Sequence, residues 1–234
     1  MTGRNLAWLV GGLLMLLALS GVARAETVEV APGVRVTKTT FEGPADEQPF
    51  FGFIDKTPKQ RAADAKLVDD LIAATGSRQK AFEAVTLRGW KAILGSRFGE
   101  AAKRFNQAYL ISPEQSSVYH GLAMVAQMRF RDLAFADELF RQAYKQQHPL
   151  KMLNADYGRL LLMAKRYREA QPVLEKAVVD TPEFGDAWAY LAFARLRNGD
   201  KPAACAAVAQ ATQNRPSRAT IGDLAHLKKD AQCE

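Results

Sequence analysis

The sequence predicts an all-α protein: a right-handed helical solenoid of about four helix-turn-helix repeats, with a capping helix at each end. The first observation is a pair of alanines seven residues apart, with a large apolar side chain between them and a proline after them. Small side chains let two helix axes approach, and the large one fills the space beside the contact. The second observation is that this pattern returns at a nearly fixed interval, which is typical of repeat proteins.

The pattern occurs four times, and its first alanines are 35, 34 and 34 residues apart. An apolar-periodic stretch with a small residue at the expected crossing, such as Gly89 or Gly158, precedes each copy. Short turns join the two helices, and a proline after each second helix favours its end. In chain order the copies are Ala101, Phe105, Ala108 and Pro113; Ala136, Phe140, Ala143 and Pro149; Ala170, Leu174, Ala177 and Pro182; and Ala204, Val208, Ala211 and Pro216.

With this pattern, residues 82–216 resemble the tetratricopeptide-repeat (TPR) family. The second repeat departs most from the family pattern, because one residue is inserted near Arg131–Leu133 and Pro149 arrives late, so the geometry of its turn stays open. An irregular helical bundle, the alternative, would not repeat its small residues so regularly. The resemblance implies protein–protein interaction as the activity. The fourth repeat matches best, through Trp188, Leu191, Ala192, Gly199, Ala204, Ala211 and Pro216.

The chain divides into five segments. They are a secretory signal (residues 1–25), an extended arm with a possible short hairpin (26–56), an N-terminal capping helix (57–76), the four repeats (77–216) and a C-terminal capping helix (217–234). A solenoid needs such caps because its end helices otherwise expose apolar faces.

The first segment has the features of a cleavable signal. Arg4 precedes a long apolar run, and Ala23-Arg24-Ala25 places small residues where signal peptidase cleaves. We therefore expect cleavage after Ala25 and a periplasmic protein. The alternative is an uncleaved membrane anchor, since the apolar run is nearly long enough to span a bilayer.

The arm combines alternating valines around Ala31-Pro32-Gly33 with the aromatic cluster Phe50, Phe51 and Phe53. An isolated hairpin is marginal in water, so we expect it to dock on the repeats. The aromatic rings either hold the arm against the solenoid or form a docking strip for a partner. Thr57, with Pro58 and Gln60 after it, predicts the capped start of the next helix.

Composition and motifs argue against nucleic-acid binding and catalysis. Loss of the signal removes two arginines and no acids, which lowers the net charge from +7 to +5, and the remaining basic residues alternate with acidic ones along the helices. The three histidines are far apart, and no HExxH, glycine-rich phosphate loop or GxSxG motif occurs. We expect no catalytic residues, no metal and no cofactor.

The first helix of each repeat in a solenoid lines a concave groove. Methionine adapts to varied apolar ligands, and arginine suits a carboxylate or a backbone carbonyl. The alternative is that some of the Met and Leu side chains pack on neighbouring helices. We expect the partner-binding side chains to be Trp90, His120, Met124, Gln127, Met128, Arg159, Leu162, Phe193 and Arg197.

These expectations predict a non-enzymatic scaffold or adaptor of the bacterial cell envelope that binds a protein segment in its groove. Some TPR relatives grip the acidic tails of heat-shock chaperones with Lys and Asn residues, and that set is not visible here. One alternative is a hydrolase-like envelope enzyme, which a deep pocket holding a carboxylate with His120 would favour. Another is a groove occupied by residues 41–56 of the chain itself.

Cys205 and Cys233 are the only cysteines. An even pair in an oxidising compartment is a candidate disulfide. If residues 217–234 fold back antiparallel, Cys233 passes Cys205 by about five residues, and a frayed tail after Asp230 would have to turn back. Two unpaired thiols remain the alternative.

Overall fold

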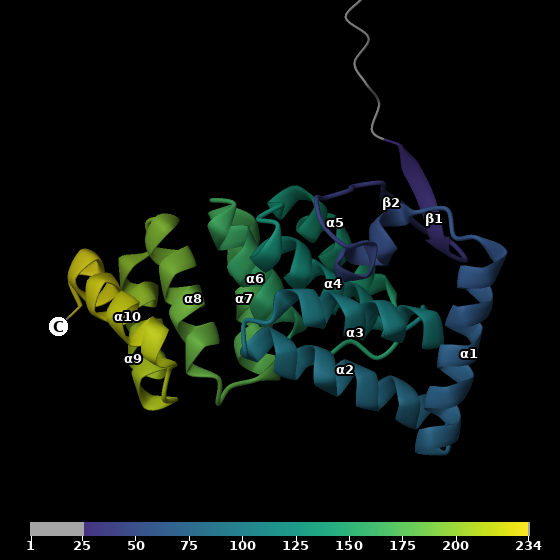
Figure 1. Ribbon diagram of the computed structural model, residues 1–234. Helices are drawn as coiled ribbons and strands as arrows, with labels where there is room; N and C mark the ends of the chain where they lie inside the picture. Colours follow the sequence, from purple (N-terminus) through teal and green to yellow (C-terminus); the bar gives the residue numbers. More distant parts are fainter. Residues whose placement is uncertain (1–25, 234) are drawn as a thin grey trace, which may run out of the picture.

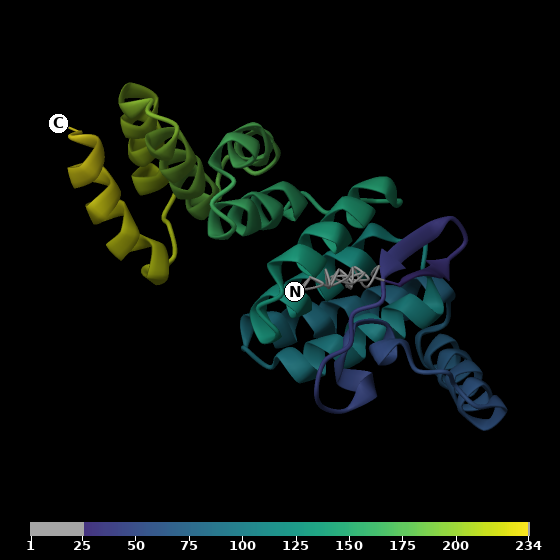
Figure 2. The same cartoon turned by 90° about the horizontal axis from the view of Figure 1, so that it is seen from above.

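The computed structural model describes residues 26–233, and the expected secretory signal lies outside them. The predicted all-α helical solenoid is confirmed: helix pairs stack one after another along the chain, from a long N-terminal helix to the C-terminal one (Figures 1 and 2). The flanking helices are α1 (Pro58–Thr75) and α10 (Arg218–Ala231). The repeat pairs are α2 (Arg78–Leu94) with α3 (Phe98–Ile111), α4 (Ser116–Arg129) with α5 (Leu133–Lys145), α6 (Leu153–Met163) with α7 (Tyr167–Asp180), and α8 (Gly185–Arg197) with α9 (Lys201–Gln213).

The alanines of the repeated pattern lie at the helix crossings. All eight are at most 1% exposed, and the large side chains between them are buried in the same core. Phe105 shows why small residues are needed there. A Cβ added to Gly121 would lie 2.2 Å from its ring, and one added to Gly89 would lie 2.9 Å away, so the ring fits only between two glycines.

The turn inside each repeat has one residue in the left-handed region. These residues are Ser96, Arg131, Lys165 and Gly199, with φ of 55°, 57°, 59° and 92°. The turn of the second repeat therefore has the same geometry as the others, although the sequence left it open. A left-handed residue at the end of a helix reverses the chain in few residues, which allows the two helices to pack antiparallel.

The irregularity of the second repeat lies after α5 instead. Seven residues, 146–152, connect α5 to α6, whereas α7 and α8 are joined by four. This connection pairs with the loop before α4, because Ser116 N–H donates to Gln147 O (2.8 Å) and Gln147 N–H donates to Glu114 O (3.0 Å). These bonds hold the connection 146–152 against the loop before α4. The two halves of the solenoid splay apart at this connection (Figure 2).

The arm begins with an antiparallel hairpin, β1 (Thr27–Ala31) and β2 (Val34–Thr37), followed by the short 3-10 helices η1 (Ala45–Glu47) and η2 (Pro49–Phe53). It packs against the second helices α3 and α5. The buried Asn106 side chain on α3 donates to the backbone carbonyls of Asp46 (3.0 Å) and Gln48 (2.8 Å). Arg129 pairs with Glu47 (2.5 Å) and lowers the pKa of that carboxyl.

The aromatic rings of the arm pack on the solenoid. Phe41 stacks on Phe130 with ring centroids 3.9 Å apart, and Phe50, 6% exposed, meets Tyr109 edge-on at 5.3 Å. These contacts favour the anchoring role of the aromatic cluster over a partner-docking strip. Residues 41–56 pack mainly on α3 and also reach α4, and none of them lines the hollows described below.

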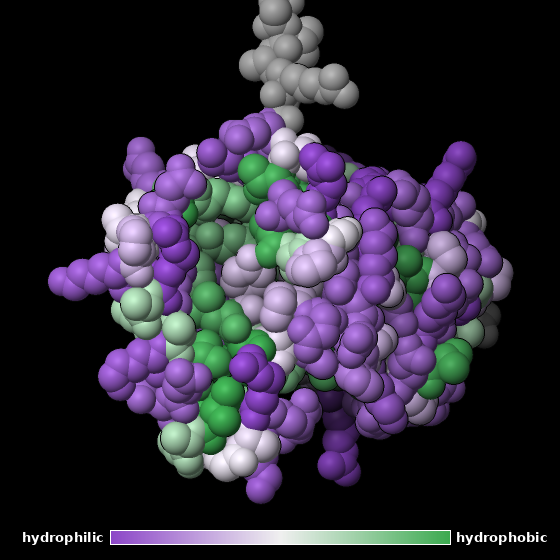
Figure 3. Space-filling view, turned by 90° about the vertical axis from the view of Figure 1, so that its right-hand side faces the viewer, coloured by the Kyte–Doolittle hydropathy of each residue, from purple (hydrophilic) through white to green (hydrophobic). Residues whose placement is uncertain are grey.

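The two flanking helices pack only partly on the repeats. Thr57 and Gln60 form the expected capping box at the start of α1, but Val68 is the only buried side chain of that helix. Seen from the end where α1 and the hairpin lie, the surface is mostly hydrophilic, with a band of apolar residues on the left and smaller apolar areas elsewhere (Figure 3). In α10, Leu224 and Leu227 are buried as expected, whereas Ile221 is 55% exposed and Thr220 is buried in its place.

Gly121→Ala should lower the free energy of unfolding by about 1–3 kcal/mol, because its methyl group collides with the Phe105 ring. Gly222→Ala is the matched control. It is also a helical glycine, nothing lies within 4 Å of its added Cβ, and better helix propensity should stabilise by up to about 1 kcal/mol. Urea denaturation measures both variants, and equal losses would contradict the crossing geometry.

Lys165→Gly should raise the free energy of unfolding by about 1 kcal/mol, because glycine adopts the left-handed conformation without steric cost. Gly199→Ala, at the equivalent turn, should lower it by a similar amount. Thermal denaturation checks the pair, and the same sign for both changes would refute this account of the turns.

Candidate binding groove

The first helices of the repeats and α10 together form one face of the solenoid. Three adjoining hollows lie along it, with volumes of about 540, 440 and 380 Å³. Arg159 of α6 lines all three, so they form one continuous depression, called the groove below.

The largest hollow brings together five of the residues predicted from the sequence. Its walls come from α2, α4, α6 and α8 and from the connection 146–152, so it bridges the two halves of the solenoid. The predicted residues that line it are Trp90, His120, Met124, Met128 and Arg159.

The other predicted residues divide between the smaller hollows and a different place. Leu162 and Phe193 line the hollow beside α10, and Gln127 lines the third hollow with Met128. Arg197 lies elsewhere: its guanidinium stacks over Tyr167 (5.2 Å), in a separate depression at the start of α7. The structure therefore does not bring Arg197 to the groove.

Several lining residues were not predicted. Leu150 belongs to the irregular connection, which has no counterpart in the other repeats and so no periodic pattern. The face of α10 was predicted only as a cap, yet it forms a wall of the groove; the spacing of its polar residues along one helix face was the available sequence signal. The unpredicted lining residues include Ser96, Arg131, Leu133, Leu150, Asp156, Phe184, Ala189, Tyr190, Thr220, Asp223, His226, Leu227 and Asp230.

His120 and Asp156 form a polar contact between the second and third repeats. His120 Nε2 lies 2.8 Å from Asp156 Oδ2, and its ring sits between Trp90 (centroids 4.7 Å apart) and Phe140 (5.6 Å). The histidine is completely buried and its Nδ1 has no partner among residues 26–233. In this arrangement Asp156 occupies Nε2.

The charged side chains of the groove differ in whether they have a hydrogen-bond or ion-pair partner within the protein. Asp156 is held by His120, and Asp186 accepts from the backbone N–H of Ser217 at 2.7 Å. Burial raises the pKa of the Tyr190 hydroxyl, and the neighbouring Arg159 opposes that rise. Arg159 makes no ion pair with a carboxylate of residues 26–233.

Two further properties bear on function. Within residues 26–233, no group of three His, Cys, Asp or Glu side chains is placed to hold a metal ion. In the same range, no helix is both long enough and apolar enough to cross a membrane.

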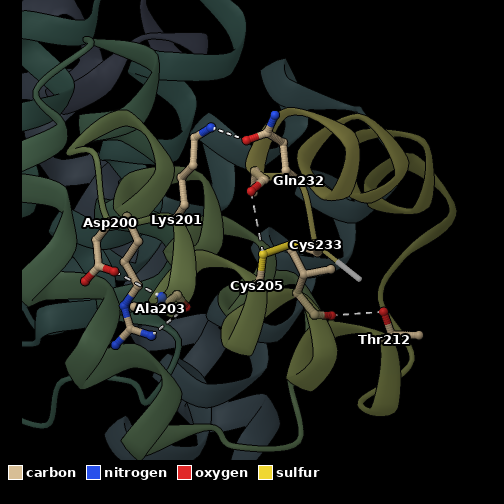
Figure 4. The surroundings of a disulfide bond; sticks show 10 residues. Asp200, Lys201, Ala203, Cys205, Thr212, Gln232 and Cys233 are labelled. Carbon is tan, nitrogen blue, oxygen red and sulfur yellow. Dashed lines mark hydrogen bonds between the residues drawn. A yellow bond between two sulfur atoms is a disulfide. The ribbon is translucent and has the colours of Figure 1, made fainter.

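Cys205 of α9 and Cys233 are joined by a disulfide, with their Cα atoms 5.4 Å apart (Figure 4). We expected a frayed tail after Asp230 to turn back toward Cys205. Instead α10 continues to Ala231, and Gln232, at φ 61°, reverses the chain so that Cys233 N–H donates to Lys228 O (2.9 Å). The bond ties the end of α10 to α9 and so holds one wall of the groove.

Mass spectrometry of the exported protein without reductant should find no alkylatable thiol. Cys205→Ser combined with Cys233→Ser should destabilise the docked α10 by about 3–4 kcal/mol, because the bond closes a loop of 28 residues in sequence separation. Hydrogen exchange in α10 measures this loss. Two alkylatable thiols in the exported protein would exclude the bond.

No protein-family profile matches the sequence, and no curated protein does. Solved structures do. PilF of Pseudomonas aeruginosa is 22% identical over 66% of this chain and 71% of its own, with a TM-score of 0.57. MamA from Desulfovibrio magneticus RS-1 is 18% identical over 68% and 89% (TM-score 0.52), and PilW, a widely conserved type IV pilus biogenesis factor, is 17% identical over 74% and 85% (0.51). At these identities the likeness establishes the fold, which is that of TPR proteins.

Proposed function

We propose that this chain, which has the TPR fold, is a non-enzymatic adaptor of the bacterial cell envelope that binds a segment of a partner protein in its groove. The observation that carries the proposal is the composition of the groove. Trp90, Met128 and Arg159 converge on one hollow of about 540 Å³ that crosses the junction between the second and third repeats.

Apolar side chains in the groove are exposed to a degree that internal packing does not explain. Leu94 is 86% exposed, Met163 50% and Leu150 38%. Aromatic residues, Met and Arg are enriched where proteins bind one another. Because Met and Leu side chains adapt to different shapes, the groove suits an extended or helical segment with apolar side chains.

Two features support an envelope location. The first 25 residues have the composition of a cleavable secretory signal, and a disulfide persists in an oxidising compartment. PilW, one of the proteins with the same fold, is a type IV pilus biogenesis factor, so this fold occurs in pilus biogenesis. Membrane association would follow only if the signal stays uncleaved.

The proposal excludes nucleic acid as the partner. The chain without its signal carries only +5, and the groove that would be the binding surface contains Asp156, Asp186, Asp223 and Asp230. A nucleic-acid site needs a clustered basic surface.

Trp90→Ala combined with Arg159→Ala should weaken capture of the partner from an envelope extract by at least about tenfold, because truncated aromatic and arginine anchors dominate binding losses. Circular dichroism should show unchanged helicity, since Trp90 is only half-buried and Arg159 makes no ion pair among the described residues. Binding is measured with the wild type and the variant side by side.

Arg197→Ala is the control, since this arginine lies outside the groove and should leave capture unchanged. Phe51→Ala tests the arm, because its half-buried ring contacts Lys56 and belongs to no groove wall. Capture that survives the Trp90 and Arg159 changes but is lost with Phe51→Ala would move the site to the arm.

One observation favours the second candidate, a hydrolase-like envelope enzyme. His120 shares the largest hollow with the carboxylate of Asp156, and such a pair could orient a general base. The completely buried ring favours a structural link instead. Hydrolysis of chromogenic esters that disappears in both His120→Gln and Asp156→Asn would support the enzyme; no activity in the wild type supports the adaptor.

A further inference from the structure

The third hollow of the groove differs from the other two in its charge. It has a volume of about 440 Å³ and is lined by Gln127, Met128, Arg131, Leu133, Arg159 and Met163. This set contains two arginines and no acidic residue. We call it the arginine hollow.

Neither guanidinium has a carboxylate partner within the described chain. The arginines that form ion pairs among residues 26–233 are others, such as Arg129 and Arg166. In the largest hollow, Asp156 and Asp186 are held by His120 and by the backbone N–H of Ser217. Asp223 and Asp230 line the hollow beside α10 and form no ion pair with Arg159. Two guanidiniums without a carboxylate partner at one apolar depression favour the binding of an anion. Arginine is the side chain best shaped to bind a carboxylate.

Gln127 is an independent sign of a ligand at the same place. The residue is 2% exposed, and its Oε1 has no donor among residues 26–233. Its Nε2 donates to the thioether of Met163 (2.9 Å), which is a weak acceptor. A buried amide oxygen without a donor is costly, so an N–H group supplied by a ligand would be strongly favoured.

A carboxylate together with an N–H group is what an acidic residue of a peptide offers. We propose that the arginine hollow receives an Asp or Glu side chain of the segment bound in the groove: Arg131 and Arg159 bind the carboxylate, and Gln127 accepts a backbone N–H of the same segment. This inference rests on the proposed function.

The shape of the groove indicates an acidic side chain within the segment rather than the carboxyl end of a chain. Arg159 lines all three hollows, so the groove continues on both sides of it. A segment bound through Arg159 therefore extends in both directions from its carboxylate. The methylene groups of the bound Asp or Glu side chain pack on the apolar lining residues Met128, Leu133 and Met163.

A random peptide library displayed on phage, selected on the disulfide-bonded protein without its signal, tests the inference. Each displayed peptide is fused at its carboxyl end, so its carboxylates are those of Asp and Glu side chains. Selected peptides should share an acidic residue flanked by apolar ones, and Glu→Gln in a selected peptide should weaken binding about tenfold or more. Selected peptides without acidic residues would overturn the inference and leave the proposed function standing; no selected peptides would overturn both.

Reversing the charge of the two arginines tests whether they bind the acidic residue. Arg131→Glu combined with Arg159→Glu should select peptides with Lys or Arg at the same position, whereas the matched control Arg197→Glu should still select acidic ones. Acidic peptides selected by both variants would overturn the site.

Gln127→Leu separates binding from folding. An apolar side chain of similar size removes the unpaired acceptor, so the melting temperature should stay the same or rise, while affinity for a selected peptide should fall about tenfold. Unchanged affinity would remove Gln127 from the site, and a lower melting temperature with unchanged affinity would give it a structural role only.

Discussion

The close approach of paired helices is the constraint on which the rest of this structure depends. Phe105 fills the space between α2, α3 and α4, and it fits because Gly89 and Gly121 have no side chain where the ring lies. In the third repeat, Gly158 makes room for the smaller side chain of Leu174 in the same way. Packed interiors are dense, so a stack of helices this close fixes the orientation of each one and thereby the face that it turns toward the groove.

The junction between the second and third repeats is the exception, and the largest of the three hollows, about 540 Å³, lies there. The connection 146–152 bonds to the loop before α4. α6 and the turn after it meet the second repeat through the Tyr157 ring, which packs on Phe140 (centroids 5.4 Å apart), and through polar contacts. These include His120 with Asp156 (2.8 Å), Tyr157 with Asp137 (2.8 Å) and Arg166 with Asp137 (2.9 Å). The same connection contributes Leu150 and Met152 to the largest hollow. An irregularity that weakens the stack thus shapes the surface proposed to bind a partner.

The two ends of the chain stabilise different faces. The arm covers α3 and α5 with aromatic rings and with backbone carbonyls that accept from Asn106, and no arm residue lines the groove. At the other end, the disulfide between Cys205 and Cys233 holds α10 beside α8 and α9, where it forms a groove wall. Because a terminal helix of a solenoid has neighbours on one side only, a covalent tie has a larger effect there than inside the stack.

The sequence by itself determined the fold class, the repeat interval and the helix crossings, because small and large residues that recur at one spacing leave few ways to pack helices. Most of the residues that it predicted for partner binding do line the groove, since the first helices of a solenoid share one face. It did not determine that Arg197 points away, that His120 and Gln127 are buried, or that Arg131 and Arg159 share a hollow. Those facts depend on how far each helix is turned and on how residues 146–152 set one half of the solenoid against the other. Side chains from repeats distant in sequence meet only in the tertiary structure, so the chemistry of the groove was decided there.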